Sequence, residues 1–215
     1  MVFVFLLSSM IMTGGNTVNI EPKYNRLPKS FYQQPTLQLA KELLGKILVH
    51  EHSEGTSSGY IVETEAYLGA EDKAAHSYGN RRTKRTEIMF HEAGLIYTYQ
   101  MHTHCLLNIV SGKADSPEAV LIRAIEPLAG IDYMLERRPV RQLKQLTSGP
   151  GKLTKAMGIT MNSYGEPIYE HPLYIAEGRE VNNILTGPRI GIPNTGEARD
   201  YPYRFWIKNN PFISR

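Results

Sequence analysis

The sequence has 215 residues, of which 41% are hydrophobic and 21% charged, which is typical of a soluble globular chain with one domain. The net charge of +3 permits a polyanionic partner without requiring one. The single cysteine, Cys105, excludes an intramolecular disulfide and a Cys-rich zinc module, and we expect an intracellular, cytoplasmic protein.

The chain begins with an apolar run that has no Lys or Arg before it and is too short to span a bilayer. This run could be a weak export signal or anchor, or an upstream extension with translation starting at Met10 or Met12. We favour a disordered or dispensable extension over residues 1–26, followed by one domain over residues 27–215. No other segment is apolar enough to cross a membrane.

The remaining sequence predicts more strands than helices. Helices are expected over 35–45, 129–138 and 148–158, the last opened by Ser148 and closed by Gly158. Strands are expected over 46–52 and 59–68, around 94–110 and 119–127, and at LYIA, PRIGI and YRFWIK. Because most strands pair with a sequence neighbour, we expect an α+β fold, a single mixed domain with a curved antiparallel sheet and flanking helices.

The strand over 59–68 carries two acids. Alternation along it groups on one face Ile61, Glu63, Glu65 and Tyr67. The residues alone favour a solvated strand face, and the functional reading is a carboxylate that activates water as a general base. Glu71 and Asp72 fit the first turn of a helix, where acids are favoured.

Arg123 lies inside the apolar strand AVLIRAIEP. A buried guanidinium needs a carboxylate or another acceptor, and Glu65 and Glu126 are the candidates. A structural ion pair and a functional one explain this pattern equally well.

Two basic stretches could bind phosphate. The loop YGNRRTKRTE is either a solvated charge run or a phosphate-binding loop, and its cations are Arg81, Arg82, Lys84 and Arg85. SGPGKLTK fails the Walker pattern, since Leu146 stands where the first glycine should be, but a helix start with Lys152 could hold one phosphate.

The segment YTYQMHTHC, taken as one strand, places Tyr97, Tyr99 and Met101 on one face, and His102 and His104 on the other. The two histidines suggest a metal site, although the sequence offers no third ligand in a fitting context. The tyrosines are either core residues or a stacking platform for a base.

Seven ordered blocks together resemble one family, the alkyladenine or 3-methyladenine DNA glycosylases, also called methylpurine glycosylases. They are IVETEAYLGAEDKAAHS, NRRTKRTEIMF, GLIYTY, NIV, AVLIRAIEP, SGPGKLTKA, and GPRIGI with GEARDYPYRFW. The resemblance runs from about Leu27 to Arg215. It implies a monofunctional, monomeric enzyme without a metal or other cofactor. Such an enzyme flips alkylated purines of the 3-methyladenine and 7-methylguanine type out of double-stranded DNA and hydrolyses the N-glycosidic bond, which starts base excision repair.

The resemblance also implies roles for single residues. Glu65 matches the general base that deprotonates a water attacking C1′, and Arg123 matches the residue that holds this water, together with a backbone carbonyl near Ile190. The residues that match the family's base pocket are Tyr67, His76, Tyr99 and Asn108. The family's wedge tyrosine has no counterpart, and Met101 or His102 is expected to fill the gap left by the flipped nucleotide.

Two other functions remain open from the residues. One is a metal-dependent hydrolase that uses His102 and His104 with a carboxylate. The other is a non-catalytic DNA-binding module that uses the basic loop and the tyrosines. No lysine is placed as a nucleophile beside the acids, which argues against strand cleavage coupled to base release.

Overall fold

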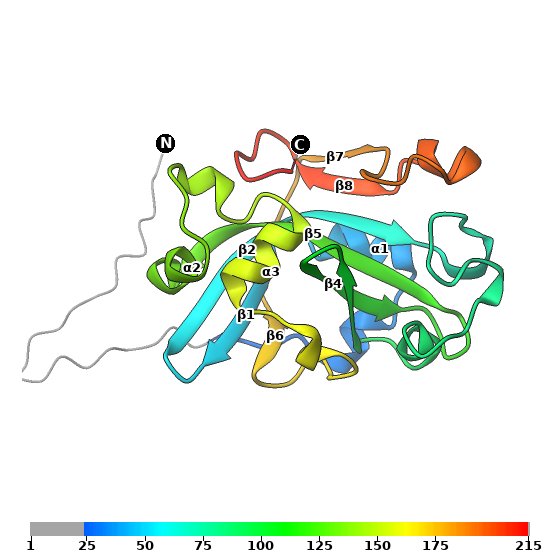
Figure 1. Ribbon diagram of the computed structural model, residues 1–215, viewed down its shortest axis with the longest axis horizontal. Coiled ribbons are helices and arrows are strands. Elements are labelled where there is room, and N and C mark those ends of the chain that lie inside the picture. The colour runs from blue at the N-terminus through cyan, green and yellow to red at the C-terminus, as the bar shows by residue number, and fades with distance from the viewer. Residues whose placement is uncertain (1–23, 215) are drawn as a thin grey trace, which may run out of the picture.

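A curled antiparallel sheet organises residues 24–214, the part of the chain that the computed structural model describes (Figure 1). The eight strands of this part are β1 (Ile47–His52), β2 (Gly55–Tyr67), β3 (Ile96–Met101), β4 (His104–Ser111), β5 (Glu118–Ala129), β6 (Leu173–Ala176), β7 (Ile184–Gly187) and β8 (Arg204–Ile207). The strand order is β3-β4-β5-β2-β1-β6, and β8 pairs with β2 and β7. The predicted α+β class, with a curved antiparallel sheet in a single domain, is confirmed.

Three α-helices flank the sheet: α1 (Thr36–Glu42), α2 (Ile131–Arg137) and α3 (Pro150–Met157). Figure 1 shows α3 in front of the sheet and α1 behind it. Both helices bury apolar side chains in the main core, with Leu39 from α1 and Leu153 from α3. Gly158 ends α3 in the left-handed conformation, as predicted, but the helix begins after Gly149 and not at Ser148, since proline is favoured at its first position.

β2 lies at the centre of the sheet. It pairs with β5 along most of its length, with β1 over Gly55–Tyr60, and with β8 over Glu63–Glu65. Register shifts between Ile61 and Thr64 mark a bulge or irregularity, which interrupts the strict alternation of side chains. Ile61 is fully buried in the main core, although alternation grouped it with the acids.

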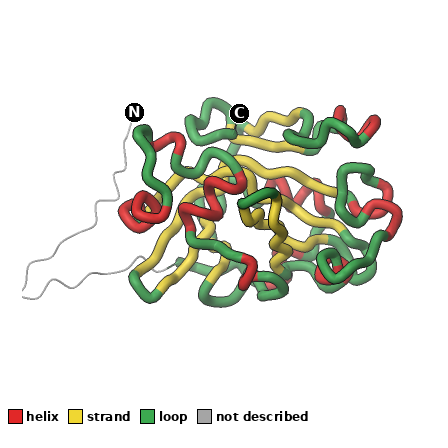
Figure 2. Tube along the Cα trace, in the orientation of Figure 1, coloured by secondary structure: helices red, strands yellow, loops and turns green. Residues whose placement is uncertain are grey.

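Two predicted strands differ in the structure. The segment 94–110 is a hairpin, because His102 and Thr103 form a tight turn between β3 and β4, with His102 at a φ of 55°. PRIGI is not a strand: β7 ends just before it, and residues 188–192 form a loop over the sheet. The long connection between β2 and β3, at the right of Figure 2, consists of loops and short 3-10 helices.

The predicted N-terminal extension lies outside the described residues as far as residue 23. Arg26 forms a bridge with Ala176, and the Leu27 N–H donates to the Ile175 carbonyl at 2.9 Å, so the chain joins the edge strand β6 there. Within residues 24–214, we find no helix with the length and apolar character needed to cross a membrane.

Candidate active site

A cavity of about 390 Å³ opens on one face of the sheet. The pairing register places Glu65 of β2 opposite Leu121 of β5, Leu121 opposite Asn108 of β4, and Asn108 opposite Tyr97 of β3. Directly paired residues point to the same face, so these four side chains form one row across four strands. The row explains how residues far apart in the sequence gather at one site.

Three segments outside the sheet complete the cavity. They are the connection that carries His76, the start of α3 at Gly149–Lys152, and the loop Ile190–Ile192. The cavity brings together most of the residues that the family resemblance singled out, and also the cation predicted at a helix start. They are Tyr67, His76, Tyr99, Met101, Asn108 and Arg123, with Lys152.

Glu65 is fully buried beside the cavity and is held by three groups. Its Oε2 accepts the Tyr67 hydroxyl at 2.8 Å and lies 3.2 Å from Arg123 Nη1, while its Oε1 accepts the Ile190 N–H at 2.7 Å. Burial raises the pKa of Glu65, and the charge of Arg123 opposes this shift. The carboxylate therefore has a fixed orientation and is a stronger base than an exposed glutamate.

The expectation of a solvated strand face is wrong for both acids, because Glu63 is as fully buried as Glu65. The β8 strand pairs with this part of β2 in the sheet, and the loop after β7 donates the Ile190 N–H to Glu65. Arg123 contacts both carboxylates, with its Nε 3.4 Å from Glu63 Oε1. Glu126, the other predicted partner of Arg123, pairs instead with Arg179.

Aromatic rings form another wall of the cavity. The Tyr97 and Tyr99 rings are stacked with centroids 5.6 Å apart, and His76 meets Tyr99 edge-on at 4.5 Å. His76 Nδ1 lies 2.7 Å from the Tyr97 hydroxyl. Burial lowers the pKa of His76 to about 4, with a further contribution from the charge of Arg85, so the ring is neutral at pH 7. The Asn108 amide donates to the Tyr97 carbonyl at 3.0 Å, which fixes its orientation.

Sequence reasoning missed a buried ion pair. Asp72, assigned to a helix start, is buried and accepts both terminal nitrogens of Arg189, one of them at 2.8 Å. The Arg189 guanidinium also lies 4.7 Å from the centre of the Tyr67 ring. This pair anchors the loop that presents the Ile190 N–H to Glu65. The apolar surroundings of the arginine in GPRIGI were the available signal, as they were for Arg123.

The tip of the β3–β4 hairpin carries both predicted wedge residues. Met101 is 46% exposed and lines the cavity, and His102 occupies the exposed turn. His104 pairs with Met101 across the hairpin and also lines the cavity, so the reading of His102 and His104 on one face of a single strand is wrong. Among residues 24–214, no three His, Cys, Asp or Glu side chains are grouped as metal ligands.

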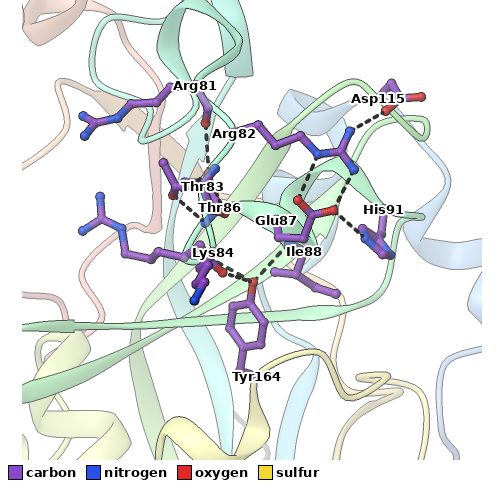
Figure 3. A network of polar contacts seen from close by, with 11 residues as sticks. Arg81, Arg82, Thr83, Lys84, Thr86, Glu87, Ile88, His91, Asp115 and Tyr164 are labelled. Atoms are coloured by element: carbon purple, nitrogen blue, oxygen red, sulfur yellow. Dashed lines mark hydrogen bonds and ion pairs between the residues drawn. The ribbon is translucent and has the colours of Figure 1, made fainter.

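Hydrogen bonds and ion pairs within the basic loop hold Arg82 in place, as Figure 3 shows. Arg82 donates to both carboxylate oxygens of Glu87, at 2.9 and 2.6 Å, contacts Asp115 at 3.3 Å, and lies 4.8 Å from the Phe90 ring centre. Figure 3 shows the Arg81 guanidinium pointing in the opposite direction. Of the four predicted phosphate-binding cations in the loop, Arg82 is therefore already engaged by two carboxylates.

The Tyr164 hydroxyl forms hydrogen bonds with the backbone of the same loop. It donates to the Lys84 and Arg85 carbonyls, each at 3.2 Å, and accepts the Ile88 N–H at 3.1 Å. These bonds fix the loop backbone where the cations are displayed. Lys152, the cation predicted at the start of α3, is exposed at the cavity mouth.

Comparison with known proteins identifies the family to which this site belongs. The sequence profile described as methylpurine-DNA glycosylase (MPG) matches residues 30–211. A relative from Bacillus subtilis (strain 168) is 64% identical over 191 residues, which is 89% of this chain and 97% of the relative. One from Bacillus licheniformis is 62% identical over 196 residues, covering 91% of this chain and all of the relative. A third, from Listeria welshimeri, is 50% identical over 185 residues, or 86% of this chain and 89% of the relative.

All three relatives carry the provisional name 3-methyladenine DNA glycosylase. The family profile spans the sheet, the cavity and both basic segments, so the match includes the whole site described above. The chain therefore belongs to the methylpurine-DNA glycosylase family, and it is a hydrolase of N-glycosyl bonds in DNA.

Proposed function

We propose that Glu65 is the general base of a monofunctional glycosylase that excises alkylated purines, of the 3-methyladenine and 7-methylguanine type, flipped out of double-stranded DNA. The observation that carries this proposal is the buried Glu65 carboxylate, oriented by Arg123 and the Ile190 N–H at the wall of a base-sized cavity. A base stacked in the duplex cannot reach such a site, so the nucleotide has to leave the helix.

In the proposed reaction, Glu65 takes a proton from a water whose oxygen attacks C1′ of the flipped nucleotide. The bond between C1′ and the purine nitrogen breaks, and its electron pair leaves with the base. An alkylated purine is cationic, so it departs as a neutral base without being protonated first. The carboxylate, rather than a metal ion, activates the water in this scheme, and Arg123 helps to hold it.

The walls of the cavity suit a cationic purine. Tyr67, Tyr99 and the neutral His76 present electron-rich rings, which stack favourably on a delocalised cation. Because His76 carries no charge at pH 7, it does not repel the positive base. We propose that Asn108, held by the Tyr97 carbonyl, crowds the exocyclic amine of guanine and so disfavours that base.

The test is base release from alkylated duplex DNA, followed by chromatography under single-turnover conditions. Glu65→Gln keeps the side-chain shape and removes the base, and we expect release to fall by about 10³-fold while binding to an abasic-site duplex persists. Glu71→Gln is the matched control, because Glu71 is an exposed glutamate just beyond the same strand, and its rate should equal that of the wild type. A Glu65→Gln variant that releases base within about tenfold of the wild-type rate would contradict the assignment.

A further inference from the structure

Glu63 is a second buried carboxylate beside the site, and the proposed reaction gives it no task. Three residues from three different segments contact it, and two of them, Arg204 and Ser214, donate hydrogen bonds to it. Arg204 of β8 donates to it at 3.1 Å, and Ser214 donates through its N–H at 2.6 Å and its hydroxyl at 2.9 Å. The third is Arg123, whose Nε lies 3.4 Å away. So many charge-assisted bonds to one carboxylate indicate a fixed arrangement.

Ser214 connects this carboxylate to Arg123. Its hydroxyl donates to Glu63 and accepts from Arg123 Nε at 3.3 Å and from Nη2 at 3.2 Å. The remaining terminal nitrogen of Arg123, Nη1, is the one that faces Glu65. The planar guanidinium is therefore clamped along one edge, which determines where its other edge points. The C-terminal segment, from the far end of the chain, completes this clamp.

We propose that Glu63 and Ser214 are positioning residues that lock the Arg123 guanidinium against Glu65 and keep Glu65 basic by sharing the charge of Arg123. This inference rests on the proposed function, since it concerns the same base. Without Glu63, a single carboxylate would face Arg123 and would be more strongly stabilised in its ionised form. A like charge nearby favours the protonated form, and the charge of Glu63 acts on Glu65 in this direction.

The ionisable groups around Glu65 come from every element packed on it. They are Glu63 and Tyr67 on β2, Arg123 on β5, Tyr99 on β3, Arg204 on β8, and Arg189 in the loop after β7. Only Glu63 among them carries the same charge as the proposed base. Replacing Glu63 by a neutral residue should therefore lower the pKa of Glu65 and move the acid limb of the pH–rate profile to lower pH.

The experiment follows the pH dependence of single-turnover base release in Glu63→Gln, together with the titration of Glu65 in ¹³C-carboxyl-labelled enzyme, assigned with Glu65→Gln. We expect both the acid limb and the Glu65 titration to move to lower pH. Glu126→Gln is the matched control, because Glu126 also lies on this sheet and is ion-paired with an arginine, Arg179, but is outside the cavity, and neither quantity should move. An unchanged Glu65 titration in folded Glu63→Gln would overturn the proposal.

Ser214→Ala tests the clamp independently and leaves all charges in place. We expect the maximal rate to fall about tenfold, with affinity for an abasic-site duplex unchanged, and Ser214→Thr to restore the rate because it keeps the hydroxyl. A wild-type rate in Ser214→Ala would refute the clamp, even if Glu63→Gln failed to fold. If the Glu65 titration moves but Glu65→Gln still releases base, the positioning network stands and the proposed base is wrong.

Discussion

Asp72 shows how strongly a single buried charge can depend on its partner. Both its oxygens are bound by Arg189, whose guanidinium also contacts the Ala66 and Ala198 carbonyls. Sequence reasoning could predict that Arg123 needs a partner, because an arginine inside an apolar strand is conspicuous. It could not predict that Asp72 pairs with Arg189, since 117 residues separate them and a helix start explains an aspartate equally well.

Replacing Asp72 by Asn should destabilise the fold severely, because it leaves the Arg189 charge buried and uncompensated. We expect the free energy of unfolding in urea to fall by about 3–5 kcal/mol. The control is Glu197→Gln, which breaks an exposed ion pair with Lys73 and should leave the unfolding midpoint almost unchanged. Equal midpoints for the two variants would show that the Asp72 pair contributes no more than a surface contact.

At the scale of elements, strand patterns in the sequence predicted where the strands lie better than they predicted which side chains each face of the sheet buries. The apolar run of β5 is visible in the sequence, because that strand is buried over most of its length, and β2 was predicted although it carries two acids. What covers Glu63 and Glu65 was not visible, since β8, the loop after β7 and Ser214 all come from more than 120 residues further along the chain. The turn at His102 was missed because neither His102 nor Thr103 is a typical turn residue.

We propose Met101 rather than His102 as the wedge, because Met101 lines the cavity while remaining half exposed. An apolar side chain at this position can fill the gap left by a flipped nucleotide. Met101→Ala should therefore slow base release from duplex DNA about tenfold without changing the melting temperature. Met161→Ala is the matched control, since Met161 is 40% exposed but does not line the cavity. A larger loss in His102→Ala than in Met101→Ala would reassign the wedge.

At the scale of the whole molecule, the arrangement of charge is more informative than the net charge of +3. Lys152 stands at the start of α3 on the cavity mouth, and Arg85 lies close enough to His76 to help lower its pKa. Lys152 and a residue near Arg85, His76, both line the cavity, so cations from two distant segments lie near the same site, as contacts to a DNA backbone would require. Composition alone permits a polyanionic partner, and only the folded arrangement indicates where it would bind.

The same arrangement predicts that Arg82 and Arg85, in one loop, contribute differently to the salt dependence of DNA binding. Each cation that neutralises a phosphate contributes about 0.9 to the slope of log affinity against log salt concentration. Arg85→Gln should therefore lower the slope for an abasic-site duplex by about that amount. In the double variant Arg82→Gln/Glu87→Gln, net charge is conserved and a pair already engaged within the loop is removed, so the slope should stay at the wild-type value. Fluorescence anisotropy from low to moderate salt measures both slopes, and a lower slope in the double variant would make Arg82 a phosphate ligand after all.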